Sequence, residues 1–424
     1  MANRRAAPDG TKPDGTTRDG TVHVVGAGLA GLSAAVRLVG AGRKVVVHEA
    51  ARHAGGRCRS YFEPALGLRI DNGNHLVLSG NKAAFAYLDA IGARDKLQGP
   101  DHAEFAFADV ATGERWTLRI NDGRLPWWIF SGERRVPGSK ATDYLALAKL
   151  LTAKPGQTIT DVIGAHGALY DRLWQPVLLS ALNTDPKEAC AVLAGAVVRE
   201  SLALGGKACR PMVAADGLAT AFVDPALAHL EARGAPVRFG QRLRRLVLAD
   251  DRVAALDLGD DGQIELRAGD GVVLAVPPQV ARMIVPDLTA PGEFRAIVNA
   301  HYKVAATGVP PLQGVVGGVV EWLFAFPDRL SVTISAGDRL LETPREELAK
   351  LIWREVAALT GMSAEAMPPW QIVREIRATF AATPAQEKLR PGARTRWPNL
   401  WLAGDWTATG LPATIEGAIR SGHT

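Results

Sequence analysis

The sequence is poor in the residues that metal centres, disulfide frameworks and membrane spans require. It has only 3 cysteines among 424 residues. Cys58, Cys190 and Cys209 show neither metal-ligand spacing nor a paired motif, so we expect reduced thiols in a cytoplasmic protein and no metal site. No uninterrupted apolar stretch reaches the roughly 20 residues of a membrane-spanning helix. The composition therefore excludes a disulfide scaffold and a bundle of transmembrane helices.

The sequence also has only a small excess of positive over negative residues. The net charge is +5 with 22% charged residues, and the basic residues are scattered rather than clustered with aromatics, so we expect no nucleic-acid partner. The apolar share of 47% is ordinary for a globular protein with large cores. Residues 1–20 are polar, repeat Asp-Gly and lack the apolar centre of a secretory signal, which predicts a flexible tail.

The strongest pattern that is present follows this tail directly, as TVHVVGAGLAGLSAAVRLVGAGRKVVVHEA. The apolar run 22–25 predicts a buried strand, and a helix-forming segment follows it and ends near Gly42. A second apolar run, 45–47, leads to Glu49, at the distance expected for an acid that binds ribose. Strand, helix, strand and acid in this register predict a βαβ unit that binds a dinucleotide.

Three glycines between the first strand and the helix complete the pattern G-x-G-x-x-G. Gly26 permits a tight turn, Gly28 lets the backbone approach a pyrophosphate, and Gly31 lets the helix pack closely on the strand. The amides at the helix start add donors at the positive end of the helix dipole. The residues that we expect to contact the cofactor here are Gly26, Ala27, Gly28, Leu29, Ala30 and Gly31.

The next glycine-rich stretch distinguishes a flavin from a nicotinamide. EAARHAGGRCRS, residues 49–60, resembles the EA…GGR…S signature of flavin amine oxidases and phytoene-desaturase-type enzymes. The resemblance implies that Glu49 and Ala50 hold the adenosine ribose. It also implies that Gly55, Gly56 and Arg57 pass the pyrophosphate and the flavin.

The C-terminal stretch LWLAGDWTATGLPATIEGAIRSG matches the closing motif of the same superfamily. We expect a strand, a Gly-Asp turn and a helix from about Thr414. By the resemblance, the two ends of the chain meet on one FAD: Asp405 accepts from ribityl or ribose hydroxyls, and the helix-start amides stabilise the negative charge of the reduced ring. A nicotinamide dehydrogenase needs no such second half-site, so FAD is the expected cofactor. The residues expected here are Gly404, Asp405, Ala413, Thr414 and Ile415.

The middle of the chain completes the expected cofactor domain. We expect a helix, a turn at Gly234 and short strands that include Leu243, whose backbone the resemblance puts at the adenine. A strand at 272–276 leads into a Pro-Pro turn. We predict an α/β fold: a Rossmann-like, amine-oxidase-like FAD-binding domain of the glutathione-reductase type with an interleaved α+β substrate domain. The predicted boundaries are 21–80, 205–288 and 394–424 for the first, and 81–204 and 289–393 for the second.

Five further stretches resemble a narrower family, the bacterial hydroxysqualene dehydroxylases or squalene-associated FAD-dependent desaturases. They are DNGNHLVLSG, WQPVLLSALNT, PMVAADGLATAFVDPAL, EWLFAF…LSVTISA and REIRATFAATPAQEKLRPGA. The resemblance runs from residue 22 to the end, and Asn74 stands where members usually carry Gln. It implies that Gly73 and Asn74 lie near the cofactor. It also implies reductive removal of the hydroxyl of hydroxysqualene, which gives squalene for hopanoid synthesis.

Such a reaction needs a general acid for the leaving hydroxyl and a dry cavity for an allylic cation. His75 is our first choice, because a histidine with a near-neutral pKa can donate a proton. Asp71 would orient it or bind the alcohol, and His301 is a rival acid. The competing interpretation of His75 is a hydrogen-bonded structural histidine beside the flavin. No second dinucleotide fingerprint is apparent, so we expect transient NAD(P)H or a reductase partner.

The segment 123–140 combines the aromatic run WWIF with nearby cations. Trp127, Trp128 and Phe130 beside Arg134 and Arg135 suit an interfacial anchor, which would place the protein at the inner face of a bacterial membrane. Core packing of the Trp pair is the alternative. For the whole chain, two other functions stay open: an oxidative carotenoid-type desaturase or amine oxidase, and a non-catalytic prenyl-lipid carrier.

Overall fold

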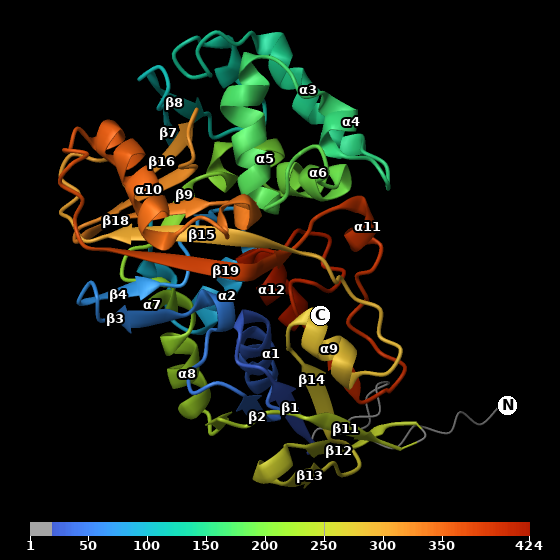
Figure 1. Cartoon of the computed structure of the whole chain (residues 1–424). Helices are drawn as coiled ribbons and strands as arrows, with labels where there is room; N and C mark the ends of the chain where they lie inside the picture. The colour runs from blue at the N-terminus through green and yellow to red at the C-terminus, as the bar shows by residue number, and fades with distance from the viewer. Residues whose placement is uncertain (1–18, 250) are drawn as a thin grey trace, which may run out of the picture.

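The computed structural model describes residues 19–249 and 251–424. The predicted tail therefore lies outside the described residues, apart from its last two positions. Two sheets dominate the chain (Figure 1): a parallel sheet in the lower half of the view and a larger sheet in the upper half, with β15 and β19 crossing between them.

The lower sheet has five strands, all parallel, in the order β10-β2-β1-β14-β20. Its strands are short apolar runs, as expected for a parallel sheet that is covered on both faces. They come from three separate pieces of chain, and the exact domain boundaries stay a prediction. The strands are β1 (Thr21–Val25), β2 (Lys44–Glu49), β10 (Val237–Phe239), β14 (Gly271–Leu274) and β20 (Leu400–Leu402).

Helix α1 (Leu29–Gly40) packs against α12 (Ile415–Gly422), so the first and last helices of the described chain are neighbours. A Cβ on Gly422 would lie 2.1 Å from Ser33 Oγ, so the helices approach to a distance that only glycine allows. Ser33 Oγ also donates a hydrogen bond of 3.0 Å to the carbonyl of Ile419. The two ends of the chain thus share one interface.

Two expectations for the middle of this region need correction. The strand expected at 272–276 is Gly271–Leu274, and Pro278 begins helix α9 (Pro278–Ile284) rather than a turn, because the fixed φ of proline suits a first helical turn. Leu243 lies in the irregular segment after β10 rather than within a strand. That segment leads into a separate antiparallel sheet of β11 (Arg245–Leu248), β12 (Val253–Asp257) and β13 (Gln263–Glu265).

The upper sheet has seven strands in the order β19-β15-β18-β17-β16-β7-β8, and only the β16–β7 pair is parallel. Helix α10 (Arg345–Thr360) covers one face, with Val298, Val332 and Leu323 packed beneath it. The opposite face looks toward α5 (Gln175–Leu182) and α6 (Ala191–Glu200). The strands are β19 (Trp370–Phe380), β15 (Phe294–Tyr302), β18 (Arg329–Ile334), β17 (Trp322–Phe326), β16 (Leu312–Val316), β7 (Ala103–Asp109) and β8 (Arg115–Ile120).

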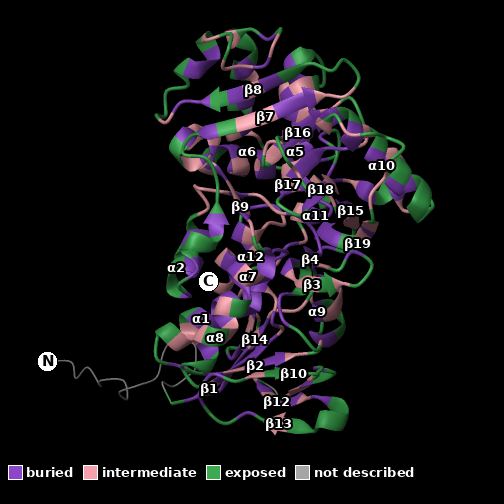
Figure 2. Ribbon diagram, turned by 90° about the vertical axis from the view of Figure 1, so that its left-hand side faces the viewer, coloured by how far each residue is buried: buried purple, intermediate pink, exposed green. Residues whose placement is uncertain are grey.

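Smaller elements complete the fold. Helices α2 (Lys82–Ala90) and α10 are exposed along their outer faces, whereas the strands between the layers are largely buried (Figure 2). Among the described residues, no helix combines the length and the apolar character needed to cross a bilayer. The remaining elements are β3 (Ser60–Glu63), β4 (Leu68–Asp71), β5 (Val77–Leu78), β6 (Leu97–Gln98), β9 (Pro211–Ala214), α3 (Leu145–Ala148), α4 (Ile159–Ile163), α7 (Leu218–Phe222), α8 (Asp224–Glu231) and α11 (Pro384–Glu387).

Candidate active site

A cavity of about 1310 Å³ lies between the two sheets. Its wall includes the glycine turn after β1, the end of β2, the start of α12 and one face of the seven-stranded sheet. The volume exceeds the roughly 300–1,000 Å³ of a single small-ligand pocket. The cavity is therefore large enough for a cofactor and a substrate together.

The glycine turn has the geometry that a close-approaching ligand needs. Gly26 has a φ of +106°, and a Cβ there would lie 2.4 Å from the carbonyl oxygen of Ala275. A Cβ on Gly31 would lie 1.9 Å from the carbonyl oxygen of Gly26, so Gly31 serves the packing of α1 on the turn. Gly28 differs, because an added Cβ would meet no atom within 4 Å and the residue lines the cavity. The open space above Gly28 is where a ligand can touch the backbone.

The carboxylate of Glu49 is fixed at the end of β2, at the cavity wall. One oxygen accepts a hydrogen bond of 2.7 Å from the amide of Ala27, and the other accepts 2.8 Å from the amide of Ala51. An ionised carboxylate has about four lone-pair sites, so acceptor capacity remains for two ribose hydroxyls. Ala50 and Gln241 line the same part of the cavity.

An ion pair joins the N-terminal and C-terminal motifs. Arg57 donates to Asp405 at 2.8 Å and to the carbonyl of Ala378 at 2.5 Å. Burial opposes the charge of Arg57, but the adjacent Asp405 carboxylate outweighs it and raises the pKa of the guanidinium. Residues 57 and 405 both line the cavity, so both of the predicted half-sites open into one space.

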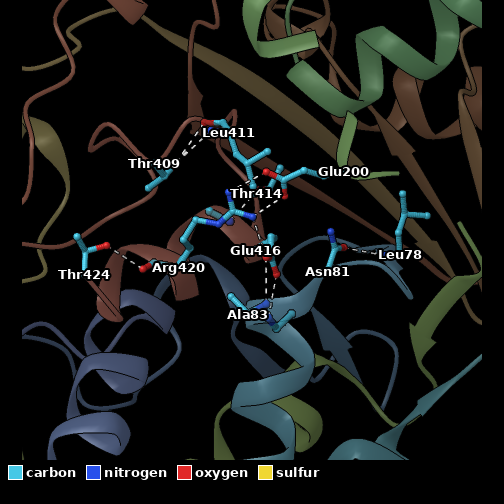
Figure 3. A network of polar contacts seen from close by, with 12 residues as sticks. Leu78, Asn81, Ala83, Glu200, Thr409, Leu411, Thr414, Glu416, Arg420 and Thr424 are labelled. Atoms are coloured by element: carbon cyan, nitrogen blue, oxygen red, sulfur yellow. Dashed lines mark hydrogen bonds and ion pairs between the residues drawn. The ribbon is translucent and has the colours of Figure 1, made fainter. Parts of the chain in front are cut away.

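A buried network holds the start of α12 in position (Figure 3). Glu416 accepts hydrogen bonds from the amides of Ala83 and Ala84 at 3.0 and 2.8 Å, and it pairs with Arg420. Arg420 pairs in turn with Glu200 of α6. Glu416 therefore ties the first turn of α12 to the first turn of α2. Ala413, Thr414 and Ile415, which directly precede Glu416, line the cavity.

The rest of the cavity wall is the inner face of the seven-stranded sheet and the helices opposite. Alternate residues of each strand point inward, as the two-residue period of a strand requires. The wall is apolar along β8, β7 and β17 and becomes polar along β18 and β15. The inward residues of these five strands include Leu118, Ile120, Phe105, Phe107, Trp322, Phe324, Thr333, Ile297 and Asn299, the edge strand β19 adds Arg374, Glu375 and Arg377, and the helical side adds Trp174, Val177 and Leu178.

Residues 29–424 match the family described as "Flavin containing amine oxidoreductase". The hydroxysqualene dehydroxylase of Rhodopseudomonas palustris is 59% identical over 403 residues, which cover 95% of this chain and 96% of the relative. The corresponding protein of Sinorhizobium fredii is 55% identical over the same shares. The chain belongs to the hydroxysqualene dehydroxylase family.

Solved structures agree with this family at the level of the fold. A putrescine oxidase has a TM-score of 0.64 at 18% identity and covers 96% of this chain and 97% of its own. The cyclohexylamine oxidase of Brevibacterium oxydans has a TM-score of 0.66 at 17% identity and covers 95% and 97%. The predicted α/β, Rossmann-like fold is confirmed, and so is FAD as the cofactor of this member of the flavin family.

The cavity fits FAD, with an open backbone at Gly28, an acid at the end of β2 and a cation at Arg57 that is paired with Asp405. Of the residues predicted to contact the cofactor, Ala27 and Gly31 alone do not line the cavity. The individual contacts stay predictions. The predicted residues that do line it are Gly26, Gly28, Leu29, Ala30, Glu49, Ala50, Gly55, Gly56, Arg57, Gly73, Asn74, Leu243, Gly404, Asp405, Ala413, Thr414 and Ile415.

Of the three predicted catalytic residues in this family member, His75 lines the cavity. The prediction of a near-neutral pKa for this histidine is wrong. Burial, and then the nearby charge of Arg57, lower the pKa of His75 to about 4. The ring is neutral at neutral pH, so it offers one N–H donor rather than a protonated acid.

Asp71 and His301 do not line the cavity, which corrects their expected roles. Asp71 accepts from the hydroxyl of Ser60 and from the amide of Leu218, so it fixes the start of α7. His301 is fully buried in β15 and bonds Ser331 at 2.8 Å, and burial lowers its pKa to about 3. Asn299 lies at the cavity, and His301 lies two residue pairs further along β15 on the same face of the strand.

The two tryptophans of the segment 123–140 lie in different environments, which the sequence did not indicate. Trp128 is 5% exposed, packs edge-to-face on Tyr144 with ring centroids 5.0 Å apart, and lines the cavity. Trp127 is 52% exposed, with the guanidinium of Arg134 4.7 Å from its ring centroid. Sequence reasoning also missed Asn299 and Thr333, although an Asn within the apolar strand FRAIVNAHY was a usable signal.

Proposed function

We propose that this chain reductively removes the hydroxyl of hydroxysqualene and gives squalene. The carbon–oxygen bond breaks, the oxygen leaves as water after taking a proton, and the carbon receives a hydride. Bound FAD supplies that hydride when reduced. The observation that carries the proposal is the single cavity in which an apolar wall continues from the FAD half-sites.

The apolar wall has a direct chemical role in this proposal. Phe107, Phe324 and Trp322 on the sheet face Trp174 and Leu178 on the helices, so the hydrocarbon chain of a triterpene would displace little bound water. An allylic cation that forms there is shielded from capture by water. The wall thereby directs the cation to the hydride rather than back to an alcohol.

His75 remains our candidate for the group that relays a proton to the leaving oxygen: its N–H proton passes to the oxygen while its other ring nitrogen takes a proton from solvent, so the ring is neutral before and after. Its neutral ring carries one N–H, which donates a hydrogen bond to the hydroxyl oxygen as the carbon–oxygen bond lengthens. Burial, and then the nearby charge of Arg57, lower the pKa of His75 and keep the ring from holding a second proton in the resting site. His75 therefore acts as an oriented donor in this scheme.

We also propose a peripheral contact with the anionic inner face of a bacterial membrane. Leu125, Trp127, Phe130 and Leu145 are exposed large apolar residues, with Trp127 stacked under a guanidinium. Trp128, within the same segment, lines the cavity from the inner side. An apolar surface directly outside the cavity wall is a short access route for a substrate that is dissolved in lipid.

The electron source in this proposal is transient NAD(P)H or a separate reductase.

The test is anaerobic incubation of the purified flavoprotein with hydroxysqualene and a chemical reductant, followed by mass spectrometry. Formation of squalene supports the proposal. Turnover only of a polyene precursor with an oxidant would instead identify a desaturase or amine oxidase. A colourless protein that binds prenyl lipids would identify a carrier.

A further inference from the structure

The cavity face of the seven-stranded sheet changes character along its width. The inward residues of β8, β7 and β17 are aromatic or aliphatic, whereas β18 presents Thr333 and β15 presents Asn299 beside the apolar Ile297. These two residues are directly opposite each other in the antiparallel register of β15 and β18. The pair lies between this apolar wall and the charged residues Arg374 and Glu375 of β19, where a mostly hydrocarbon ligand can hold a single polar group.

A third residue joins this pair and forms what we call the amide cluster: Asn74, Asn299 and Thr333. The hydroxyl of Thr333 donates to Asn299 Oδ1 at 2.8 Å, and Asn74 Nδ2 donates to Thr333 Oγ1 at 3.2 Å. The backbone amide of Asn74 donates to Asn299 Oδ1 at 3.4 Å. All three residues line the cavity, and Asn74 immediately precedes His75.

One atom of the amide cluster has no partner. Asn74 is 7% exposed, and its Oδ1 makes no hydrogen bond with any of the described residues. Buried side-chain oxygens in folded proteins are nearly always paired, by protein, water or ligand. Because the backbone amide and Nδ2 of Asn74 donate to Asn299 and Thr333, Oδ1 is the acceptor of this side chain that is left without a protein partner among the described residues.

We propose that the amide cluster binds the hydroxyl group of the alcohol substrate, with Asn74 Oδ1 accepting the hydrogen bond of the hydroxyl proton. This inference rests on the function proposed above. A hydroxyl held in this way keeps its lone pairs for the N–H of the adjacent His75. The cluster thus selects an alcohol over the parent hydrocarbon and puts the reacting carbon at the cofactor end of the apolar wall.

Two variants test the cluster: Asn74→Leu, which keeps the branched shape without the polar atoms, and Thr333→Val, which replaces the hydroxyl by a methyl group. Thr117→Val is the matched control, because Thr117 lies on β8 of the same sheet and outside the cavity lining. We expect Thr333→Val to keep its flavin, because Thr333 is not among the residues predicted to contact the cofactor. We also expect each cluster variant to bind hydroxysqualene about tenfold more weakly, with unchanged binding of squalene, as for the loss of one hydrogen bond. Binding is followed by the perturbation of the flavin absorbance spectrum.

The outcomes separate the alternatives. Loss of flavin from both cluster variants would assign the cluster to the cofactor, and equal weakening for squalene and hydroxysqualene would make it structural. Either result overturns the inference. The binding comparison needs no turnover, so a wild-type protein that prefers the alcohol but never forms squalene would overturn the proposed function and leave the cluster standing.

Discussion

The two sheets meet the shared cavity in different ways. The five-stranded parallel sheet presents its carboxyl edge, where backbone turns at Gly26 and Gly404 and a helix start face the cavity. The seven-stranded sheet presents its face, where side chains of alternate residues make the wall. Recognition by backbone depends on what glycine permits, whereas recognition by side chains depends on strand register. The four predictions below vary one or the other.

The largest effect should come from two glycines of the same turn. Gly31→Val should abolish folding or cost about 3 kcal/mol or more, because its Cβ would overlap backbone at 1.9 Å. Gly28→Val should leave the fold intact but remove FAD, because its side chain would occupy only cavity space. Thermal melting and flavin content of both variants check this. A stable, yellow Gly28→Val protein would contradict the ligand position.

A smaller loss of cofactor should follow a change at Glu49. Glu49→Ala removes a charge-assisted acceptor for ribose, and we expect FAD affinity to fall by roughly 1.5–3 kcal/mol. Glu49→Gln is the control, since it retains one acceptor for the amide of Ala27. The measurement is the flavin-to-protein ratio after extended dialysis. Equal retention by wild type and Glu49→Ala would remove this residue from the site.

Substitutions of the neighbouring residues Trp127 and Trp128 should have different effects, because Trp127 lies on the exposed surface and Trp128 lies in the cavity wall. Trp127→Ser should weaken binding to anionic liposomes by about 1–2 kcal/mol, because an interfacial ring is only partly buried, and leave stability unchanged. Trp128→Ser should instead lower the melting temperature, since that ring packs on Tyr144. Liposome co-sedimentation and melting of both proteins give the comparison. If Trp127→Ser binds liposomes as wild type does, the membrane contact loses its support.

The smallest effect concerns one buried histidine in each sheet. Burial and neighbouring charge lower the folded pKa of His23 to about 4 and that of His301 to about 3, against 6.5 when unfolded. Below pH 6.5 each histidine becomes protonated in the unfolded chain but stays neutral in the folded chain. The free energy of unfolding therefore decreases as the pH is lowered from 6.5 to the folded pKa. Between pH 7 and 6 the loss is about 0.7 kcal/mol per histidine. Denaturant unfolding of His23→Gln and His301→Gln should show a shallower fall, and an unchanged slope would contradict it.

The same contrast explains what could be predicted from the sequence. The parallel sheet and the glycine turns that bind FAD could be predicted from the sequence, because the spacing of the glycines and of Glu49 follows directly from the backbone geometry of a βαβ unit. The catalytic assignment could not. Asn299 and His301 lie on the same face of β15, and which of them lines the cavity depends on where along the strand the cavity ends. The low pKa of His75 depends on burial and on the charge of Arg57, which comes from another segment of the chain. Trp127 and Trp128 differ only in which side of one short turn each occupies.

The contact between Ser33 and Ile419 spans 386 residues of chain, and β20 completes a sheet that β1 begins. Loop closure over such a separation carries a large entropic cost, and non-local pairing slows folding. During translation the glycine turn leaves the ribosome long before its partner exists. We therefore expect the FAD half-sites to come together only when the last helix docks, which would make cofactor capture a late step of folding.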